Sequence, residues 1–433
     1  MSRRVPAPPA VAAPRALRVA ALLLLAALLV TGAAAAELGQ DLQGLLAQAR
    51  AQSPELAAMR SEAQAAAQRV DPAGALPDPV LRVELMDVTN KATDGSFNLL
   101  PSRVGETKYT LMQTLPAWGK RGLRRAAAAA EVQAATARAD AAWTELAARI
   151  KAGYARYYLA SANERLTGEI LQLAASVEQV AQARYAGGLT GQQDAIRAQL
   201  EQTGMRSELL MLESEKRQAR ARLNALLARD AAAPLAEPLA LPPLPAAQRM
   251  DPAALAQRLR EGNPLLRAEQ AKLRGAGSTR ELALRNRYPD LTLGIAPSQM
   301  GSRISSWGLM LEVAIPLQQD VRRAQEAEAL AMVDAAQQRS EALAHQLLGD
   351  LGEQLAALDA ARRSEELVTT RSLPQSELGL RSALAAYENG KLDFSSLLEA
   401  QRQIRKARQD RLKAQVEARL RLAEIERLLG EDL

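Results

Sequence analysis

Long stretches of the chain carry apolar residues at alternating spacings of four and three, the pattern of a coiled-coil seam. One such stretch runs from Arg121 to Tyr185 without a proline, so a single helix can span it. At 1.5 Å per residue this helix would reach about 100 Å. Its seam positions are Leu166, Ile170, Leu173, Val177 and Val180. The pattern therefore predicts an extended fold built on long helices.

The same spacing resumes further along the chain and predicts a second helix that returns antiparallel to the first. Its seam positions are Met205, Leu209, Leu212, Lys216, Ala219, Leu223 and Leu226. The equivalent long helix in the second half of the chain contains Pro374. Since proline has no backbone N–H and disturbs the preceding turn, we expect a kink there.

Other segments alternate apolar and mixed side chains with a period of two, which predicts strands with one apolar face. In one strand Trp307, Leu309, Leu311, Val313 and Ile315 alternate with Gly308, Met310, Glu312 and Ala314. In others Leu81, Val83 and Leu85 alternate with Arg82 and Glu84, and Tyr109, Leu111, Gln113 and Leu115 continue the apolar face. We predict β-hairpins at about 80–115 and 291–315, with 291–296 paired to 307–315. The first hairpin holds the longer loop, around 90–106.

The second half of the chain repeats the first at a spacing of about 200 residues. Ser53-Pro54 matches Asn263-Pro264, Leu76-Pro77-Asp78 matches Tyr288-Pro289-Asp290, Leu115-Pro116 matches Ile315-Pro316, and Arg124-Arg125 matches Arg322-Arg323. At a constant offset of 202, Tyr185, Gly188, Ala198-Gln199 and Leu226-Leu227 match Tyr387, Gly390, Ala400-Gln401 and Leu428-Leu429. We predict a repeat at 37–229, with a helical hairpin at about 118–229. A second follows at 253–433, with its hairpin at about 318–430. Five prolines between 234 and 245 predict that 230–252 is an extended linker.

Composition agrees with this picture and excludes several classes of protein. Aromatic residues make up only 3% of the chain, which disfavours a compact globular core. Residues 1–36 have the features of a signal peptide: four arginines, an apolar run of about a dozen residues, and Ala34-Ala35-Ala36 before Glu37. Without those four arginines the net charge falls from +6 to +2, so nucleic acid is not an expected partner. The absence of cysteine excludes disulfides and a lipid-anchor cysteine.

Four strands per chain leave both edges of a sheet with unpaired backbone groups. Closed membrane barrels start at about eight strands, so a chain that contributes four must share its barrel with copies of itself. If the apolar faces contact lipid, the barrel lumen is lined by Arg82, Glu84, Thr110, Met112 and Glu312. A soluble sheet packed on the helices is the alternative.

Residues for catalysis or for a bound cofactor are not apparent. His345 is the one histidine and has no cysteine or second histidine to complete a zinc site. Residues 187–191 lack the Lys-Ser/Thr of a phosphate-binding loop and suit a turn between helices. The ten methionines are scattered, which favours gap filling or placement in a lumen over a copper path. We therefore predict neither an enzyme nor a cofactor.

The repeated Tyr-x-x-Gly turn with its Ala-Gln pair, the duplicated helix–hairpin–helix order and the terminal Leu-Leu resemble the TolC-like outer-membrane efflux proteins. Leu76–Val80 and Leu115–Arg125 look like the heavy-metal branch of that family. The resemblance implies a mainly α fold with a β-barrel part. Three copies would form one transmembrane β-barrel and a periplasmic α-barrel. It also implies that the protein lies in the outer membrane, with a large periplasmic part. The implied partners are a periplasmic adaptor and an inner-membrane RND pump.

The resemblance further implies that the two turns form the periplasmic tip. The implied adaptor contacts there are Tyr185, Gly188, Leu189, Thr190, Tyr387, Gly390 and Lys391. Two gate carboxylates of the family fall on Ser396 and Glu399, and the first is not acidic here, so Asp393 and Asp194 are candidates for the missing charge. The alternative is that these residues are ordinary solvated positions near a turn.

Three functions compete on these grounds. The first is a passive duct for heavy-metal cations in a tripartite efflux system. The second is a duct of the same family for drugs or type I secreted polypeptides. The third, from another class, is a periplasmic coiled-coil adaptor without a pore.

Overall fold

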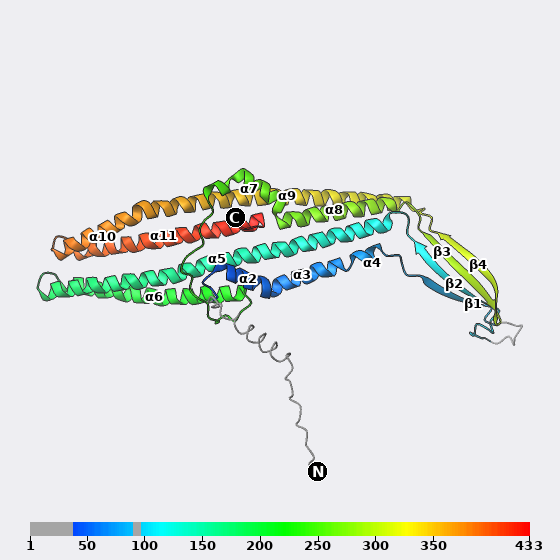
Figure 1. Cartoon of the computed structure of the whole chain (residues 1–433), viewed down its shortest axis with the longest axis horizontal. Coiled ribbons are helices and arrows are strands. Elements are labelled where there is room, and N and C mark those ends of the chain that lie inside the picture. Colours follow the sequence, from blue (N-terminus) through cyan, green and yellow to red (C-terminus); the bar gives the residue numbers. More distant parts are fainter. Residues whose placement is uncertain (1–37, 90–96) are drawn as a thin grey trace, which may run out of the picture.

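The structure, a computed structural model, describes residues 38–89 and 97–433. The predicted signal peptide lies outside this part of the chain. Helices lie side by side along the long axis, the sheet forms one end, and two helical turns form the other (Figure 1). The predicted mainly α fold with a small antiparallel sheet is confirmed.

Both halves of the chain follow the same basic order, with short helices, two strands, a long helical segment and a returning helix. The first half contains α2 (Leu42–Gln52), α3 (Pro54–Ala67), α4 (Val70–Gly74), β1 (Val80–Met86), β2 (Glu106–Leu115), α5 (Lys120–Ala186) and α6 (Gln192–Leu226). The second contains η1 (Ala247–Met250), α7 (Pro252–Gly262), α8 (Pro264–Arg285), β3 (Leu291–Met300), β4 (Arg303–Val313), α9 (Gln319–Leu367), η2 (Val368–Ser372), α10 (Leu373–Glu388) and α11 (Phe394–Leu429).

Helix α5 is continuous over 67 residues, as the absence of proline predicts. Its seam residues Leu166, Ile170 and Val177 are buried, and Met205 and Leu212 of the returning α6 are buried as well. Helices α5 and α6 lie side by side and run in opposite directions (Figure 1). The predicted antiparallel helical hairpin is confirmed.

A kink was predicted at Pro374, and the structure has a π-helix directly before the helix that contains this proline. Residues Val368–Ser372 form this five-residue element, and α10 begins directly after it, with Pro374 in its first turn. A proline cannot donate to the carbonyl one α-helical turn earlier, so the wider turn places the missing donor where a new helix starts. The Thr370 hydroxyl donates to the Glu366 carbonyl oxygen over 2.7 Å.

The four strands form one antiparallel sheet in the order β1-β2-β3-β4. Strand β3 pairs with β4 as predicted, and the central β2–β3 pair joins the two halves of the chain. Two residues, Gly301 and Ser302, connect β3 to β4, whereas the connection from Met86 to Glu106 is long and includes 90–96, outside the described residues. The first hairpin therefore holds the longer loop, as expected.

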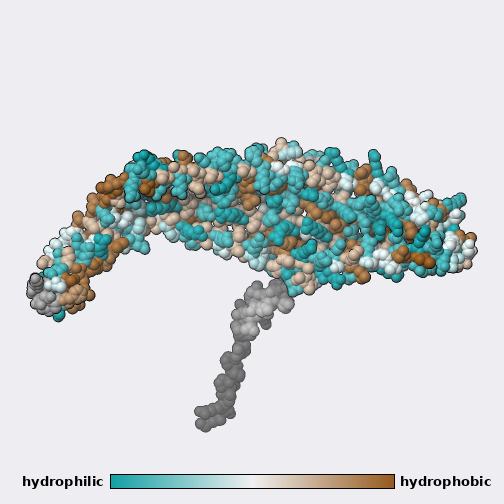
Figure 2. Space-filling view, turned by 180° about the vertical axis from the view of Figure 1, so that it is seen from behind, coloured by the Kyte–Doolittle hydropathy of each residue, from teal (hydrophilic) through white to brown (hydrophobic). Residues whose placement is uncertain are grey.

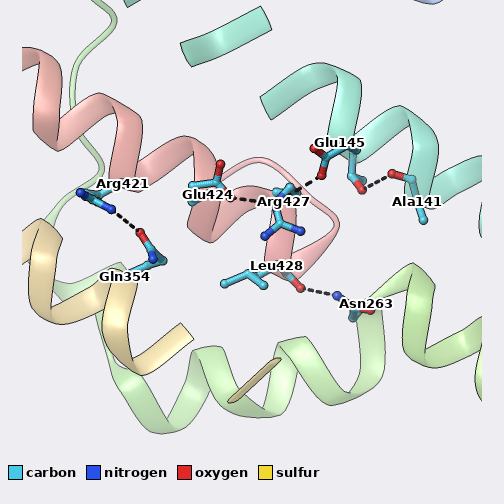
Figure 3. Close-up of polar contacts among 9 residues, drawn as sticks. Ala141, Glu145, Asn263, Gln354, Arg421, Glu424, Arg427 and Leu428 are labelled. Atoms are coloured by element: carbon cyan, nitrogen blue, oxygen red, sulfur yellow. Dashed lines mark hydrogen bonds and ion pairs between the residues drawn. The ribbon is translucent and has the colours of Figure 1, made fainter. Parts of the chain in front are cut away.

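Equivalent helices in the two halves start with the same cap. Ser53 and Asn263 each precede a proline, and their side chains accept from the backbone N–H of Leu56 and Leu266. Asn263 has a second role, because its Nδ2 donates to the Leu428 carbonyl oxygen over 2.8 Å (Figure 3). This buried bond ties the start of α8 to the end of α11.

Replacing Asn263 by alanine should destabilise the protein more than the matched Ser53→Ala change. Losing a helix cap costs about 1 kcal/mol in either variant. Asn263→Ala also leaves a buried carbonyl unpaired, which adds about 1–3 kcal/mol. Thermal unfolding at fixed protein concentration and scan rate measures the difference. Equal midpoints for the two variants would contradict the structural role assigned to the Asn263–Leu428 bond.

Candidate functional site

The sheet has two chemically different faces, and the strand register assigns every strand residue to one of them. Arg82 lies opposite Thr110, Met112 lies opposite Gly294, and Thr292 lies opposite Glu312. Because paired residues share a face, the five predicted lumen residues all lie on one side: Arg82, Glu84, Thr110, Met112 and Glu312. The same face carries two features that were not predicted from the sequence, namely Lys108 and a contact of 3.1 Å between the Thr114 and Thr292 hydroxyls.

This polar face is concave. A methyl group placed on Gly294 would lie 3.4 Å from the Cβ atoms of both Met112 and Met310, and one placed on Gly308 would lie 3.5 Å from that of Ala296. Cβ atoms of paired residues are usually about 4.5–5.5 Å apart, so neighbouring strands tilt toward each other on this side. Small residues at these positions permit the curvature. Accordingly Thr110, Met112 and Ala296 are buried within the hollow.

The convex face is apolar and open. Leu309 is 90% exposed, and Trp307, Leu311, Leu81 and Ile295 are exposed as well. Figure 2 shows hydrophobic side chains gathered over the sheet end of the molecule. The outer edges of β1 and β4 have no strand partner among the described residues. A curved sheet with two open edges and a bare apolar face is an incomplete structure in this single chain.

At the opposite end of the molecule, both helical hairpins turn with the same backbone geometry. Gly188 and Gly390 have φ of +69° and +70°. The N–H of Leu189 donates to the Arg184 carbonyl, and that of Lys391 donates to the Ala386 carbonyl, each over 2.9 Å. Glycine occupies the left-handed position in both because it carries no Cβ penalty there. The 202-residue offset found in the sequence thus holds at the level of single hydrogen bonds.

The two turns differ in their side chains. Tyr185 is exposed, whereas Tyr387 is buried and packs against Phe394 at 5.5 Å between ring centroids. Among the other predicted tip residues, Leu189 and Lys391 are exposed and Thr190 is half-buried. Desolvation raises the pKa of Tyr387, with Asp194 as a further cause. Tyr387 is therefore part of the tip core and has almost no surface for a partner.

Arg184 clamps one hairpin to the other. Its Nη1 donates to the carbonyl oxygens of Tyr387 and Glu388 over 2.7 and 2.9 Å, and its guanidinium lies 4.9 Å from the centre of the Tyr387 ring. A cation is favourable there because the carbonyls at the C-terminus of α10 carry partial negative charge. The second repeat has Ala386 at the equivalent position, so the second hairpin has no matching arginine to contact the first.

The candidate gate residues of α11 form one exposed stripe. Asp393 immediately precedes the helix but makes no side-chain capping bond to its backbone, and Ser396 donates its hydroxyl to the Asp393 carboxylate over 2.5 Å. Hydroxyl donation from Ser395 and Ser396 lowers the pKa of Asp393, which keeps this carboxylate ionised as the pH falls. Glu399 lies one turn beyond Ser396 and is exposed. Asp194, in the first turn of α6, is the counterpart of Ser396 at the 202-residue offset.

Ion pairs also join the hairpins behind the tip. Arg402 of α11 lies 2.7 Å from Glu201 of α6, and Arg405 lies 2.9 Å from Glu208. These pairs were not predicted, because opposite charges at such sequence separations carry no local pattern.

Among the residues that the structure describes, no group of three or more His, Cys, Asp and Glu side chains is suited to a metal ion. In the same part of the chain, none of the helices is both long and apolar enough to cross a membrane.

Comparisons with known proteins agree on one family. Residues 45–229 and 255–431 match the model of the family described as outer membrane efflux protein. The chain is 26% identical over 374 residues to the cobalt-zinc-cadmium resistance protein CzcC of Cupriavidus metallidurans, covering 85% of this chain and 84% of that protein.

Solved structures share the fold. The outer membrane protein VceC of Vibrio cholerae gives a TM-score of 0.76 at 19% identity, over 90% of this chain and 96% of that one. CusC, whose structures are described in terms of transmembrane channel formation, gives 0.75 at 17% identity, over 90% and 92%. The outer-membrane channel OprN gives 0.75 at 19%, over 90% and 89%. The fold is that of TolC-like channels, and these neighbours are channels rather than enzymes.

Replacing Arg184 by glutamine should loosen the tip without unfolding the helices. Hydrogen bonds from a charged donor contribute about 1.5–3 kcal/mol, and partial exposure of Arg184 brings the expected loss to about 1.4 kcal/mol. Amide hydrogens of 385–392 should therefore exchange roughly tenfold faster. Hydrogen exchange with mass spectrometry measures this change.

The matched control is Arg197→Gln, which removes an exposed arginine near the start of α6. Exchange at 385–392 should be unchanged in that variant. Equal acceleration in both variants would mean that lost charge, and not the clamp, loosens the tip.

Proposed function

The chain belongs to the outer membrane efflux protein family, and from that premise we propose that it is the outer-membrane channel subunit of a tripartite efflux system exporting heavy-metal cations. The duct is passive, and an inner-membrane RND pump drives the transport. A periplasmic adaptor connects the pump to the tip of the helical hairpins. The competing prediction of an adaptor without a pore disagrees with the family match and with the channel folds of the structural neighbours.

One observation carries the pore proposal: among residues 38–89 and 97–433 the curved sheet has two open edges, and it exposes its apolar side outward. In a membrane every backbone N–H and C=O needs a partner, so such a sheet must close. Pairing β4 of one chain with β1 of the next would satisfy both edges. Three chains with four strands each then enclose a lumen lined by the concave polar face.

The cation proposal rests on the relative CzcC and on charge at the tip. CzcC is named for resistance to cobalt, zinc and cadmium and matches most of the chain. In the proposed trimer, the exposed stripe of Asp393, Ser396 and Glu399 would be repeated around the passage. A ring of carboxylates in a narrow passage attracts cations and repels anions.

The adaptor would dock on the exposed residues of the two turns. Tyr185 and Leu189 of the first turn and Lys391 of the second offer accessible side chains. Gly188 and Gly390 set the turn geometry, and Thr190 follows Gly188 in the first turn. We leave Tyr387 out of this proposed surface because its side chain is buried.

A deletion strain tests the function directly. Cells without this protein should become sensitive to cobalt, zinc or cadmium, and the wild-type gene should restore resistance. Leu309→Arg should fail to restore it, since an arginine on the lipid-facing side of a barrel costs about 2–4 kcal/mol per chain near the membrane centre. Ser306→Arg changes the concave face of the same strand and should restore resistance.

Three outcomes would count against the proposal. Unchanged metal tolerance with new sensitivity to drugs, or with loss of a secreted polypeptide, would favour the second duct function. Full activity of Leu309→Arg would refute the lipid-facing assignment. Recovery of the protein as a soluble periplasmic monomer would exclude a pore.

Glu399→Gln should reduce the preference of single channels for cations over anions. Each of three equivalent carboxylates contributes on the order of 1 kcal/mol to an ion passing at about 4 Å in water, so a severalfold change is expected. Reversal potentials in planar bilayers under a salt gradient measure it. The control is Glu261→Gln on α7, which lies on the outside of the helical body (Figure 1). Unaltered selectivity in Glu399→Gln would remove this residue from the gate.

A further inference from the structure

Positive charge is concentrated where the sheet meets the helices. We define the basic collar as the ten residues flanking each strand on the helix side, namely 70–79, 116–125, 281–290 and 314–323. It contains five acidic residues and eight basic ones: Lys120, Arg121, Arg124, Arg125, Arg285, Arg287, Arg322 and Arg323. The collar thus carries a net charge of +3, whereas residues 37–433 as a whole carry +2. The rest of that part of the chain is slightly negative.

Ion pairs neutralise some of these side chains. Lys120 lies 2.8 Å from Asp290, Arg323 lies 3.6 Å from Asp320, and Arg285 lies 3.8 Å from Glu281. Arg125 pairs with Asp71, and Arg287 pairs with Glu326.

Three arginines of the collar remain without a carboxylate within 4.0 Å among the described residues: Arg121, Arg124 and Arg322. The Arg121 Nε donates to the Gly74 carbonyl oxygen over 2.8 Å, and Arg322 donates to the Asn286 carbonyl oxygen. A neutral carbonyl orients a guanidinium without cancelling its charge. These contacts hold two of the arginines in place and leave their charge available to an anion.

Apolar side chains continue from the convex face of the sheet into the collar. Ile315 and Leu317 extend the alternating line of Leu311 and Val313, and they are 70% and 82% exposed. Trp118, in the connection between β2 and α5, is 94% exposed. Tryptophan prefers the boundary between lipid and water at the rim of a barrel. From the sheet toward the helices, the apolar side chains are therefore followed by Trp118 and then by the arginines at the start of α5. This sequence matches the change from lipid to headgroups at a membrane surface.

We propose that the basic collar binds the phosphate headgroups of anionic phospholipids in the leaflet nearest the helical part. This inference rests on the proposed function for the insertion of the sheet into a membrane. Two properties select the ligand: guanidinium groups form paired hydrogen bonds with phosphate, and a net positive surface beside lipid attracts a headgroup with net negative charge. A zwitterionic headgroup has the same phosphate but no net charge. The collar also gives a physical role to the Lys120–Arg125 segment of the motif at 115–125.

Lipid preference can be measured at Trp118 itself. The chain has three tryptophans, so Trp143→Phe with Trp307→Phe leaves Trp118 as the single fluorophore. The trimer is reconstituted in two kinds of lipid mixture. One contains acyl-brominated phosphatidylcholine with unbrominated phosphatidylglycerol, and the other contains acyl-brominated phosphatidylglycerol with unbrominated phosphatidylcholine. Quenching then gives the relative association constant of the two lipids beside Trp118. Replacing Arg121 and Arg124 by glutamine should lower the preference for phosphatidylglycerol by about fivefold per side chain. High salt should weaken the same preference in the parent protein.

Two controls accompany this variant. Lysine at both positions keeps the charge and should retain most of the preference. Arg217→Gln with Arg339→Gln removes two exposed arginines from α6 and α9, away from the collar, and should leave it unchanged. Equal quenching by both lipids in the parent protein, or an unchanged preference in the glutamine variant, would overturn the proposal. Failure of the proposed function looks different, because a protein that does not insert would show no quenching by either brominated lipid.

Discussion

Within the described part of the chain, both edges of the four-stranded sheet are unpaired, and this is the constraint on which the rest of the structure depends. Each edge presents backbone donors and acceptors without partners, and the apolar convex face cannot be left in water. Small residues such as Gly294 and Gly308 let the sheet curve toward its polar side. In the proposed trimer this curvature would turn the open edges toward neighbouring copies, so that each chain forms one segment of the barrel wall.

The helices solve a different problem, which is to hold a thin structure together over a great length. Helix α5 packs on α6 through buried seam residues and also contacts α8, α11 and α3, so the two halves of the chain share one body. Local devices recur at equivalent places, including the caps at Ser53 and Asn263 and the glycine turns at the tip. Other bonds connect elements that are far apart in the sequence, as the bond from Asn263 to Leu428 connects the start of α8 to the end of α11.

The two copies share the same backbone architecture, but their side chains differ at the tip. Arg184 has no counterpart in the second turn, Tyr387 is buried while Tyr185 is exposed, and Asp194 corresponds to Ser396. The two hairpins are therefore joined asymmetrically although their backbones turn alike. Along the molecule the surface changes from an apolar sheet through a cationic junction to a tip with exposed carboxylates.

The sequence by itself determined the length of the longest helix, the strand alternation, the repeat and the turn glycines, because these follow from periodicities and from residues close together in the chain. It also placed Arg82, Glu84, Thr110, Met112 and Glu312 on one kind of face, since side chains alternate along a strand. Only the tertiary structure decided that β2 pairs with β3, that the polar face is the concave one, and that Arg184 contacts Tyr387. Those features depend on residues roughly 180 to 200 positions apart, brought together by packing, and no local pattern encodes such a contact.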